Sequence, residues 1–133
     1  MRGVRDEAMI TALTEVHDGY RQFRFSGTAD DLSLVQAVRK LWQEPGYHPD
    51  RPEIYDFRFL DSTLVSLHGL AALQRMNVEM HADAPLQRVA VLVGATHQYA
   101  LAQAGIPYSR SRGAAMAVFH SESEAVAWVT GAD

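Results

Sequence analysis

The last third of the chain alternates between strand-like and helix-like patterns, and this alternation most constrains the fold. Within QRVAVLV at 87–93, Val89 to Val93 form a continuous apolar run, typical of a strand that helices cover on both faces. AMAVF at 115–119 is a second such run, and Ser121 and Glu124 then have the spacing of a capping box that opens a helix. Because neighbouring parallel strands need a crossover, usually a helix, this order predicts a parallel α/β layer.

The start of the chain predicts a β-hairpin. Residues 9–16 and 20–26 form two short strand-like runs, and the second alternates between apolar and polar side chains. Between them stands Asp18-Gly19, a dipeptide favoured in two-residue hairpin turns because glycine tolerates a positive φ. We expect this hairpin to lie at the edge of the sheet.

A helix is expected after the hairpin, since the apolar residues take helical spacing from Leu34 to Leu41. Thr28, followed three residues later by Asp31, also has capping-box spacing. This pair predicts a helix that starts near Ala29 and ends before the proline-rich stretch that follows.

Three further segments complete the predicted order. EIYDFRF at 53–59 indicates a third strand, a helical stripe follows at 66–81, and a short helix is expected at 95–104. The chain should therefore have an α/β fold, with helices packed on one mixed, mostly parallel five-stranded sheet in the order β-β-α-β-α-β-α-β-α. We expect a single domain over residues 1–133, in which residues 1–8 form a loose N-terminal extension.

The composition excludes several classes of protein. The chain has 133 residues, of which 47% are hydrophobic, and this is enough for one globular core. Its net charge of -4 argues against nucleic-acid binding, which needs a basic surface. The sequence contains no apolar window of the roughly 20 residues that span a membrane, so we expect no stable membrane insertion and a cytoplasmic protein.

No motif in the sequence points to catalysis. There is no cysteine, which rules out a cysteine nucleophile and a thiolate metal site. The six histidines lack the spacing of metal ligands, and neither a Gly-x-Ser-x-Gly string nor a phosphate-binding glycine motif occurs. We therefore expect no catalytic residues, no metal and no cofactor, and we expect that the chain is not an enzyme.

One candidate polar site lies at the predicted end of the third strand. Asp56 and Asp61 flank Arg58 there, at the edge where open α/β sheets bind ligands. These residues form either a polar ligand site or an exposed charged loop with a local ion pair.

A second candidate lies between that strand and the next helix, where we place Ser62 and Ser66. A phosphate there would bring negative charge to a helix N-terminus and could act as a switch. The alternative is that one of these serines is simply the helix N-cap.

Several strings also resemble the SpoIIAA-like family, a branch of the STAS and SEC14-type α/β domains. They cover most of the chain and are FRFSGTADDL, LWQEPGYHPDRPEIYDFR, QRVAVLVGATHQYALAQ and AVFHSESEAVAWV. In the related anti-sigma-factor antagonists, a serine in an Asp-Ser-Ser-Gly string at a helix start is phosphorylated by a partner kinase. This chain has FLDSTLVSLHGL, in which Ser62 follows an acid and Ser66 falls closer to the helix start.

The resemblance implies a non-enzymatic regulatory or protein-interaction domain of bacterial type, which acts as a homodimer with a protein partner still to be identified. The alternative is a SEC14-like carrier or sensor of a small apolar ligand or lipid. Its pocket would be lined by Trp42, Tyr55, Phe57 or Tyr99. Without such a pocket, these aromatic side chains belong to the core.

Overall fold

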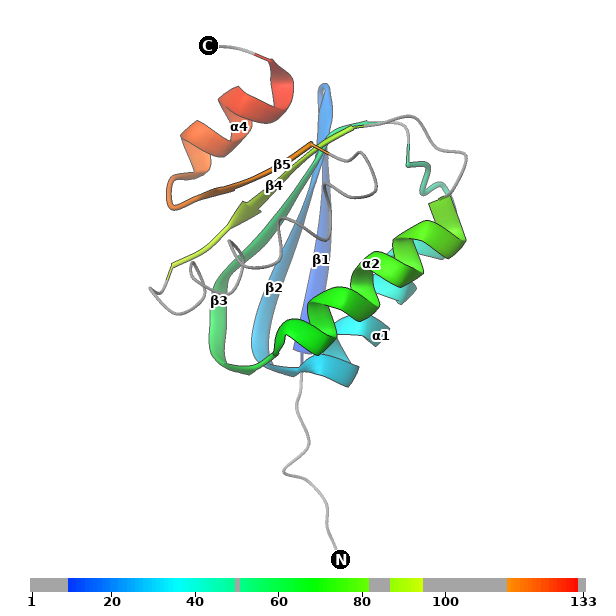
Figure 1. The fold of residues 1–133 in the computed structure, drawn as a ribbon. Coiled ribbons are helices and arrows are strands. Elements are labelled where there is room, and N and C mark those ends of the chain that lie inside the picture. The colour runs from blue at the N-terminus through cyan, green and yellow to red at the C-terminus, as the bar shows by residue number, and fades with distance from the viewer. Residues whose placement is uncertain (1–9, 50, 82–86, 95–114, 132–133) are drawn as a thin grey trace, which may run out of the picture.

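The computed structural model describes residues 10–49, 51–81, 87–94 and 115–131 (Figure 1). Their elements, in chain order, are β1 (Ile10–His17), β2 (Tyr20–Asp30), α1 (Asp31–Trp42), β3 (Glu53–Leu64), α2 (Leu67–His81), β4 (Arg88–Leu92), β5 (Ala115–Phe119) and α4 (Glu122–Thr130). The strands form one sheet in the order β1-β2-β3-β4-β5. β1 is antiparallel to β2 and the other pairs are parallel. The predicted fold class is confirmed, and the helix expected at 95–104 lies outside the described residues.

β1 and β2 form the predicted hairpin at the edge of the sheet. Their pairing runs in unbroken register from His17 opposite Tyr20, beside the turn, to Ile10 opposite Gly27. Gly19 in the turn has a φ of +90°, which glycine adopts without the steric cost that a Cβ atom would add. Figure 1 shows β1 as the outermost strand on one side of the sheet.

β2 is longer than predicted, and α1 starts later. The fully buried Ala29 belongs to β2, which continues to Asp30. The Asp30 carboxylate accepts the Ser33 N–H at 2.8 Å, and the Ser33 hydroxyl accepts the Asp30 N–H at 2.9 Å. The capping box is therefore Asp30 with Ser33. The predicted box of Thr28 with Asp31 is wrong, because pairing with β3 keeps Thr28 in a strand.

β3 also runs past its predicted end at Phe59 and reaches Leu64. The additional residues pair with the end of β2, where Thr28 lies opposite Ser62 after irregularities in the register. Ser62 therefore lies within a strand, and its predicted place between strand and helix is wrong. α2 begins at Leu67, one residue after the predicted start.

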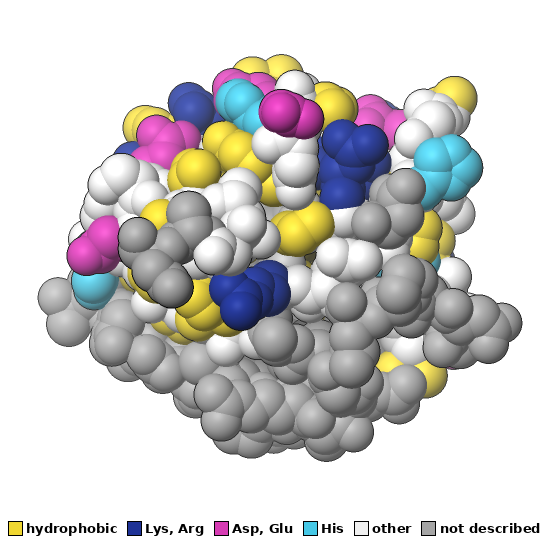
Figure 2. All heavy atoms as spheres, turned by 90° about the horizontal axis from the view of Figure 1, so that it is seen from above, with side chains coloured by type: hydrophobic (Ala, Val, Ile, Leu, Met, Phe, Trp, Pro, Cys, Tyr) yellow, Lys and Arg dark blue, Asp and Glu magenta, His cyan; other side chains and the backbone are white. Residues whose placement is uncertain are grey.

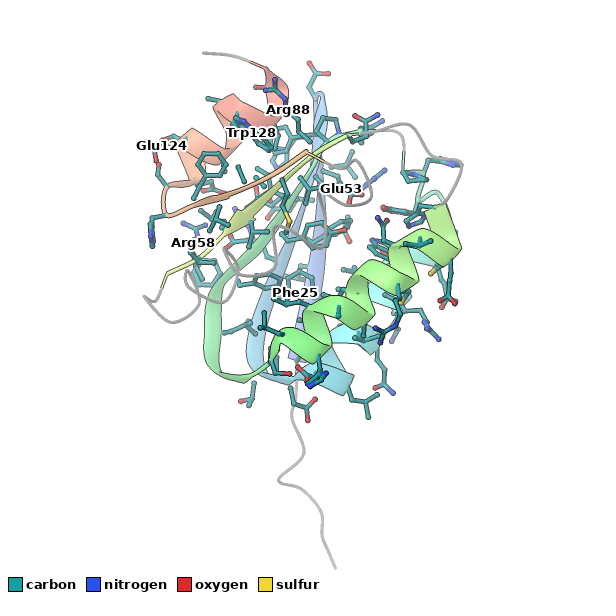
Figure 3. All side chains as sticks on the ribbon, viewed as in Figure 1. Phe25, Glu53, Arg58, Arg88, Glu124 and Trp128 are labelled. Carbon is teal, nitrogen blue, oxygen red and sulfur yellow. The ribbon has the colours of Figure 1, made fainter. Side chains whose placement is uncertain are left out.

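The sheet separates two cores. The first lies between the sheet and helices α1 and α2, and its buried members are Phe23, Phe25, Leu34, Val38, Leu41 and Met76. The second lies between the sheet and α4, and its buried members are Ile54, Ala90, Leu92, Ala125 and Val129. Figure 1 shows α1 and α2 on one side of the sheet and α4 on the other, and Figure 3 shows Phe25 on the side of α2.

α4 is capped at both ends. The predicted N-cap, Ser121, accepts the Glu124 N–H at 3.4 Å. At the other end, Arg88 donates to the Trp128 carbonyl at 2.6 Å, and its guanidinium lies 5.2 Å from the centre of the Trp128 ring (Figure 3). A cation at this position offsets the partial negative charge of a helix C-terminus. Within the described residues, none of the helices has the length and hydropathy to cross a bilayer.

Candidate functional site

The start of α2 is joined to the start of α1 through Ser66 and Asp31. Ser66 directly precedes α2, and its hydroxyl accepts the His68 N–H at 3.2 Å while its carbonyl accepts the Leu70 N–H at 3.2 Å. These contacts give Ser66 the geometry of an N-cap. The Asp31 carboxylate accepts the Ser66 N–H at 2.6 Å and the Ser66 hydroxyl at 2.7 Å. One candidate serine therefore connects two helix N-termini.

Gly69 leaves room for this contact. A Cβ atom built at Gly69 would lie 2.7 Å from Cγ of Asp31, far inside van der Waals distance. Any larger residue would therefore push Asp31 away from Ser66. Glycine inside a helix costs about 1 kcal/mol relative to alanine, and the approach of Asp31 explains why α2 carries one in its first turn.

Two exposed apolar side chains flank the contact between Asp31 and Ser66. Leu32 is 65% exposed and Leu67 is 42% exposed, and each directly follows one of the two bonded residues. His68, also exposed, is the next residue of α2. We call Asp31, Leu32, Ser66, Leu67 and His68 the helix-start surface. It presents two exposed apolar side chains beside polar groups at two helix starts.

The other candidate serine and its neighbour are placed only by their backbone. Asp61 and Ser62 belong to β3, and their side chains lie outside the described part of the structure. Of the two serines considered for a switch, Ser66 is thus the one that precedes a helix.

Asp56 lies in the middle of β3 and is fully buried, so its predicted position at a strand end is wrong. Its Oδ1 accepts the Arg58 N–H at 3.1 Å and the Arg58 Nε–H at 3.0 Å. Its Oδ2 accepts Arg58 Nη2 at 2.8 Å and Gln22 Nε2 at 3.3 Å. These bonds to Asp56 are the main cause that raises the pKa of Arg58. Four donors fill the acceptor capacity of this carboxylate.

Glu122, the first residue of α4, extends this polar network across the sheet. Its Oε2 accepts Gln22 Nε2 at 2.9 Å and Arg24 Nη2 at 3.0 Å, and Arg58 Nη2 lies 3.7 Å from its Oε1. Arg24 also lies 3.3 Å from Glu15 of β1. Because three side chains of β2 and β3 converge on Glu122, the network holds the start of α4 on the sheet. Figure 3 shows Arg58 on this side.

A second buried carboxylate, Glu53, begins β3 on the opposite face (Figure 3). Its Oε2 accepts the Tyr47 hydroxyl at 2.6 Å and Arg21 Nη1 at 3.3 Å, and its Oε1 accepts the Tyr55 hydroxyl at 2.7 Å. Burial raises the pKa of Glu53 in spite of these donors. Arg21 also donates to the His48 carbonyl at 3.1 Å, which fixes the loop before β3 to the sheet.

The described aromatic residues of the predicted apolar pocket lie in or beside the first core. Trp42 Nε1 donates to the Tyr55 hydroxyl at 3.0 Å, and burial is the main cause that raises the pKa of Tyr55 well above its ordinary range. The rings of Tyr55 and Phe57 lie 6.2 and 5.0 Å from the ring of Phe25. Tyr99 lies outside the described residues. The other three side chains therefore contact one another or Phe25.

His81 also belongs to this aromatic group, although no sequence pattern predicted its position there. Its ring lies 4.6 Å from that of Trp42, edge to face, and 5.7 Å from that of Tyr47. Burial lowers the pKa of His81, and its buried Nε2 has no hydrogen-bond partner among the described residues. The only available signal was its place at the end of the predicted helical stripe.

The described residues show no cluster of three His, Asp or Glu side chains that could hold a metal ion. Figure 2 shows acidic, basic and hydrophobic side chains interspersed on one face of the molecule. Among the described residues, the helix-start surface and the network around Asp56 are the two candidate functional arrangements.

No family model matches the sequence, and no curated protein matches it at a significant level. Solved structures do match in fold. An uncharacterised protein of the DUF3478 family from Shewanella loihica PV-4, described as having a SpoIIAA-like fold, has a TM-score of 0.57 and 13% identity, covering 96% of this chain and 99% of its own. An anti-sigma factor antagonist from Mycobacterium paratuberculosis has a TM-score of 0.59 and 18% identity, covering 91% of this chain and 94% of its own.

These matches establish that the chain has a SpoIIAA-like fold, which confirms the resemblance at the level of fold. At identities of 13% and 18% they assign no role to any residue.

Proposed function

We propose that this chain is a non-enzymatic regulatory domain of the STAS type, which binds another protein through the helix-start surface. The observation that carries the proposal is the pair of hydrogen bonds between Ser66 and Asp31, flanked by the exposed Leu32 and Leu67. The leucines supply apolar contact area, and the serine supplies a hydroxyl at its centre. The fold shared with an anti-sigma factor antagonist supports a regulatory role.

Phosphorylation of Ser66 would change this surface in a definite way. The phosphate would add a charge of about -1.5 to -2 to the oxygen that now donates to Asp31. Asp31 would lose the hydroxyl donor of Ser66 and face a like charge, whereas the N-terminus of α2 would favour the phosphate. Asp31 would therefore move away, and Leu32, the next residue, would move with it. A partner that binds the unmodified surface would be released.

The test compares partner binding by the wild-type chain and by surface variants. Proteins retained by immobilised wild-type chain from an extract of its source cells are identified, one is purified, and its Kd is measured by calorimetry. Ser66→Asp and Leu67→Lys should each raise this Kd at least about tenfold, equivalent to ~1.4 kcal/mol. Ser66→Ala should have a smaller effect, because it adds no charge.

The matched control is Ser123→Asp, which makes the same change at an exposed serine in the first turn of α4. It should leave the Kd unchanged. Melting curves of every variant confirm that each is folded. If Ser66→Asp and Leu67→Lys both bind the partner as tightly as the wild-type chain does, the helix-start surface is not the contact.

The carrier hypothesis has less support, since Trp42, Tyr55 and Phe57 contact one another or Phe25. A carrier would be stabilised by any ligand that binds only the folded state. A melting screen against fatty acids and phospholipids therefore tests it, and a ligand that raises the Tm of the wild-type chain but not of Trp42→Ala would favour it.

A further inference from the structure

Among the described residues, no strand pairs with the outer edge of β1, and this edge lacks the usual protection. β1 is an edge strand of the sheet, and its partner β2 pairs with it in unbroken register. Residues 10–17 contain no proline, lysine or arginine. Edge strands of monomeric proteins are commonly blunted by these residues or by a bulge, because their unpaired backbone groups bind other strands. β1 is therefore suited to pair with a further strand.

The hydrogen bonding of β2 determines which residues of β1 direct their backbone N–H and C=O groups to the outer edge of the sheet. The Arg21 N–H donates to the Pro52 carbonyl at 3.0 Å, so it points toward β3 and away from β1. Arg21 lies opposite Val16, and this is consequently a pair without mutual hydrogen bonds. Val16 must then direct its own N–H and C=O to the free edge, and the direction alternates along the strand. The residues with outward backbone groups are Ile10, Ala12, Thr14 and Val16.

Two large apolar side chains of β1 are exposed, one on each face. Leu13 is 61% exposed and lies on the same face as Glu15, which pairs with Arg24 at 3.3 Å. Val16 is 65% exposed and lies on the opposite face, toward α1 and α2, where Ala12 packs against the first core. A strand added at the free edge would cover both.

We propose that β1 pairs antiparallel with β1 of a second copy of this chain, about a two-fold axis that passes beside Leu13. The opposed residues would be Ile10 with Val16, Thr11 with Glu15, Ala12 with Thr14, and Leu13 with Leu13. The hydrogen-bonded pairs in this register are those whose backbone groups point outward. The two five-stranded sheets then become one continuous sheet.

This register gives more favourable side-chain pairs than the two adjacent registers, whose axes lie at Thr14 and at Ala12. A two-fold axis at Thr14 would place Leu13 against Glu15, and an axis at Ala12 would leave Val16 without an opposite residue within β1. The axis at Leu13 opposes apolar residues on both faces and brings no like charges together, which is the favourable pattern for cross-strand pairs. The pairing uses no residue of the helix-start surface, so it stands independently of the proposed function.

The first experiment is sedimentation equilibrium of the full chain, whose mass is 14.8 kDa. A reversible dimer is expected. Leu13→Lys should raise the dimer Kd by at least about tenfold, because it sets two ammonium groups against each other at the axis. Gln36→Lys is the control and should leave the dimer Kd unchanged, since it adds the same ammonium group at an exposed position of α1 that belongs to neither proposed surface. Circular dichroism verifies that both variants are folded.

The second experiment tests the register through disulfide formation. The chain has no cysteine, so Leu13→Cys and Val16→Cys each introduce a single thiol. Under the added oxidant diamide, which takes up the two electrons and two protons, Leu13→Cys should form a covalent dimer rapidly. Val16→Cys should do so much more slowly, because its opposite residue is Ile10.

Three results would overturn the proposal. They are a full chain that stays monomeric over the whole concentration range, a dimer that Leu13→Lys does not weaken, and a Val16→Cys variant that crosslinks as fast as Leu13→Cys. The last two would place the dimer contact at another surface or in another register.

Discussion

Asp31 and Ser66 lie 35 residues apart in the sequence, yet one carboxylate accepts both the N–H and the hydroxyl of the serine. The first turn of a helix has unpaired N–H groups and a partial positive charge. Asp31 is in the first turn of α1, and through Ser66 it also reaches the first turn of α2. A single negative charge therefore serves two helix starts.

Removal of this carboxylate should destabilise the fold. Asp31→Ala takes away both acceptors of the Ser66 donors, and we expect the free energy of unfolding to fall by about 1 to 2 kcal/mol. Urea denaturation measures the change. Gln36→Ala, at an exposed position of α1, is the control and should leave stability nearly unchanged. Equal midpoints for Asp31→Ala and the wild-type chain would show that the contact contributes nothing.

Gly69→Ala should destabilise the wild-type chain although alanine is the better helix former. The new Cβ would collide with the Asp31 carboxyl group, and we expect this to outweigh the ~1 kcal/mol gained from helix propensity. In an Asp31→Ala background the same substitution should instead stabilise. A double-mutant cycle by urea denaturation gives the coupling, and a Gly69→Ala change of the same sign in both backgrounds would contradict this explanation.

The ion pair of the buried Asp56 and the partly exposed Arg58 should be far more sensitive than an exposed acid. Asp56→Ala removes a fully buried carboxylate and leaves Gln22 and the partly exposed Arg58 without this acceptor, and we expect a loss of ~3 kcal/mol in the free energy of unfolding. Glu124→Ala, an exposed acid of α4, should change it by less than about 0.5 kcal/mol. Urea is the denaturant to use here, because guanidinium chloride is a salt and its ions would screen the attraction between Asp56 and Arg58. If both variants lose a similar amount of unfolding free energy, the buried Asp56 contributes no more to stability than an exposed acid does.

His81 predicts a pH dependence of stability. Burial lowers its pKa below the unfolded value of 6.5, so its contribution is fully present above pH 6.5 and is lost as the pH falls through the lower folded pKa. His81→Phe keeps an aromatic ring but cannot bind the proton. The stability of the wild-type chain relative to this variant should therefore decrease from about pH 7 to about pH 5.

The quantity to measure is the difference in unfolding free energy between the wild-type chain and His81→Phe at each pH. This is because Glu53 changes stability with pH in the opposite direction to His81. The pKa of Glu53 is raised, and its contribution is lost as the pH rises through that folded value. Glu53 is present in both proteins, so its effect cancels to first order. Parallel stability curves for the wild-type chain and His81→Phe would show that His81 has the same pKa in the folded and unfolded states.

Local patterns predicted most of the elements. The hairpin around Gly19 and the N-cap at Ser121 each depend on residues that are adjacent or nearly adjacent in the chain, and both are found. The prediction misplaced the start of α1 because Thr28 and Asp30 are both suitable N-cap residues by sequence. Pairing of β2 with β3, which no local pattern reveals, decides between them.

The contacts of the site were harder to predict, because its partners are distant in sequence. Ser66 could be placed near a helix start from its spacing, whereas Asp31, its partner, lies one strand and one helix earlier. Asp56 did carry a signal, since strand alternation puts it on the same face as the buried Ile54. Gln22, which donates to it from 34 residues away, did not.

The position of α4 has a consequence for how the protein is made. Glu122 is bound by Gln22, which the ribosome adds 100 residues earlier, and α4 covers apolar residues of β3 and β4 that also precede it. During synthesis these strands emerge before their cover exists, and exposed apolar strands aggregate readily. The nascent chain therefore passes through a stage at which α4 does not yet cover these apolar residues of β3 and β4, and this stage is the one most exposed to aggregation.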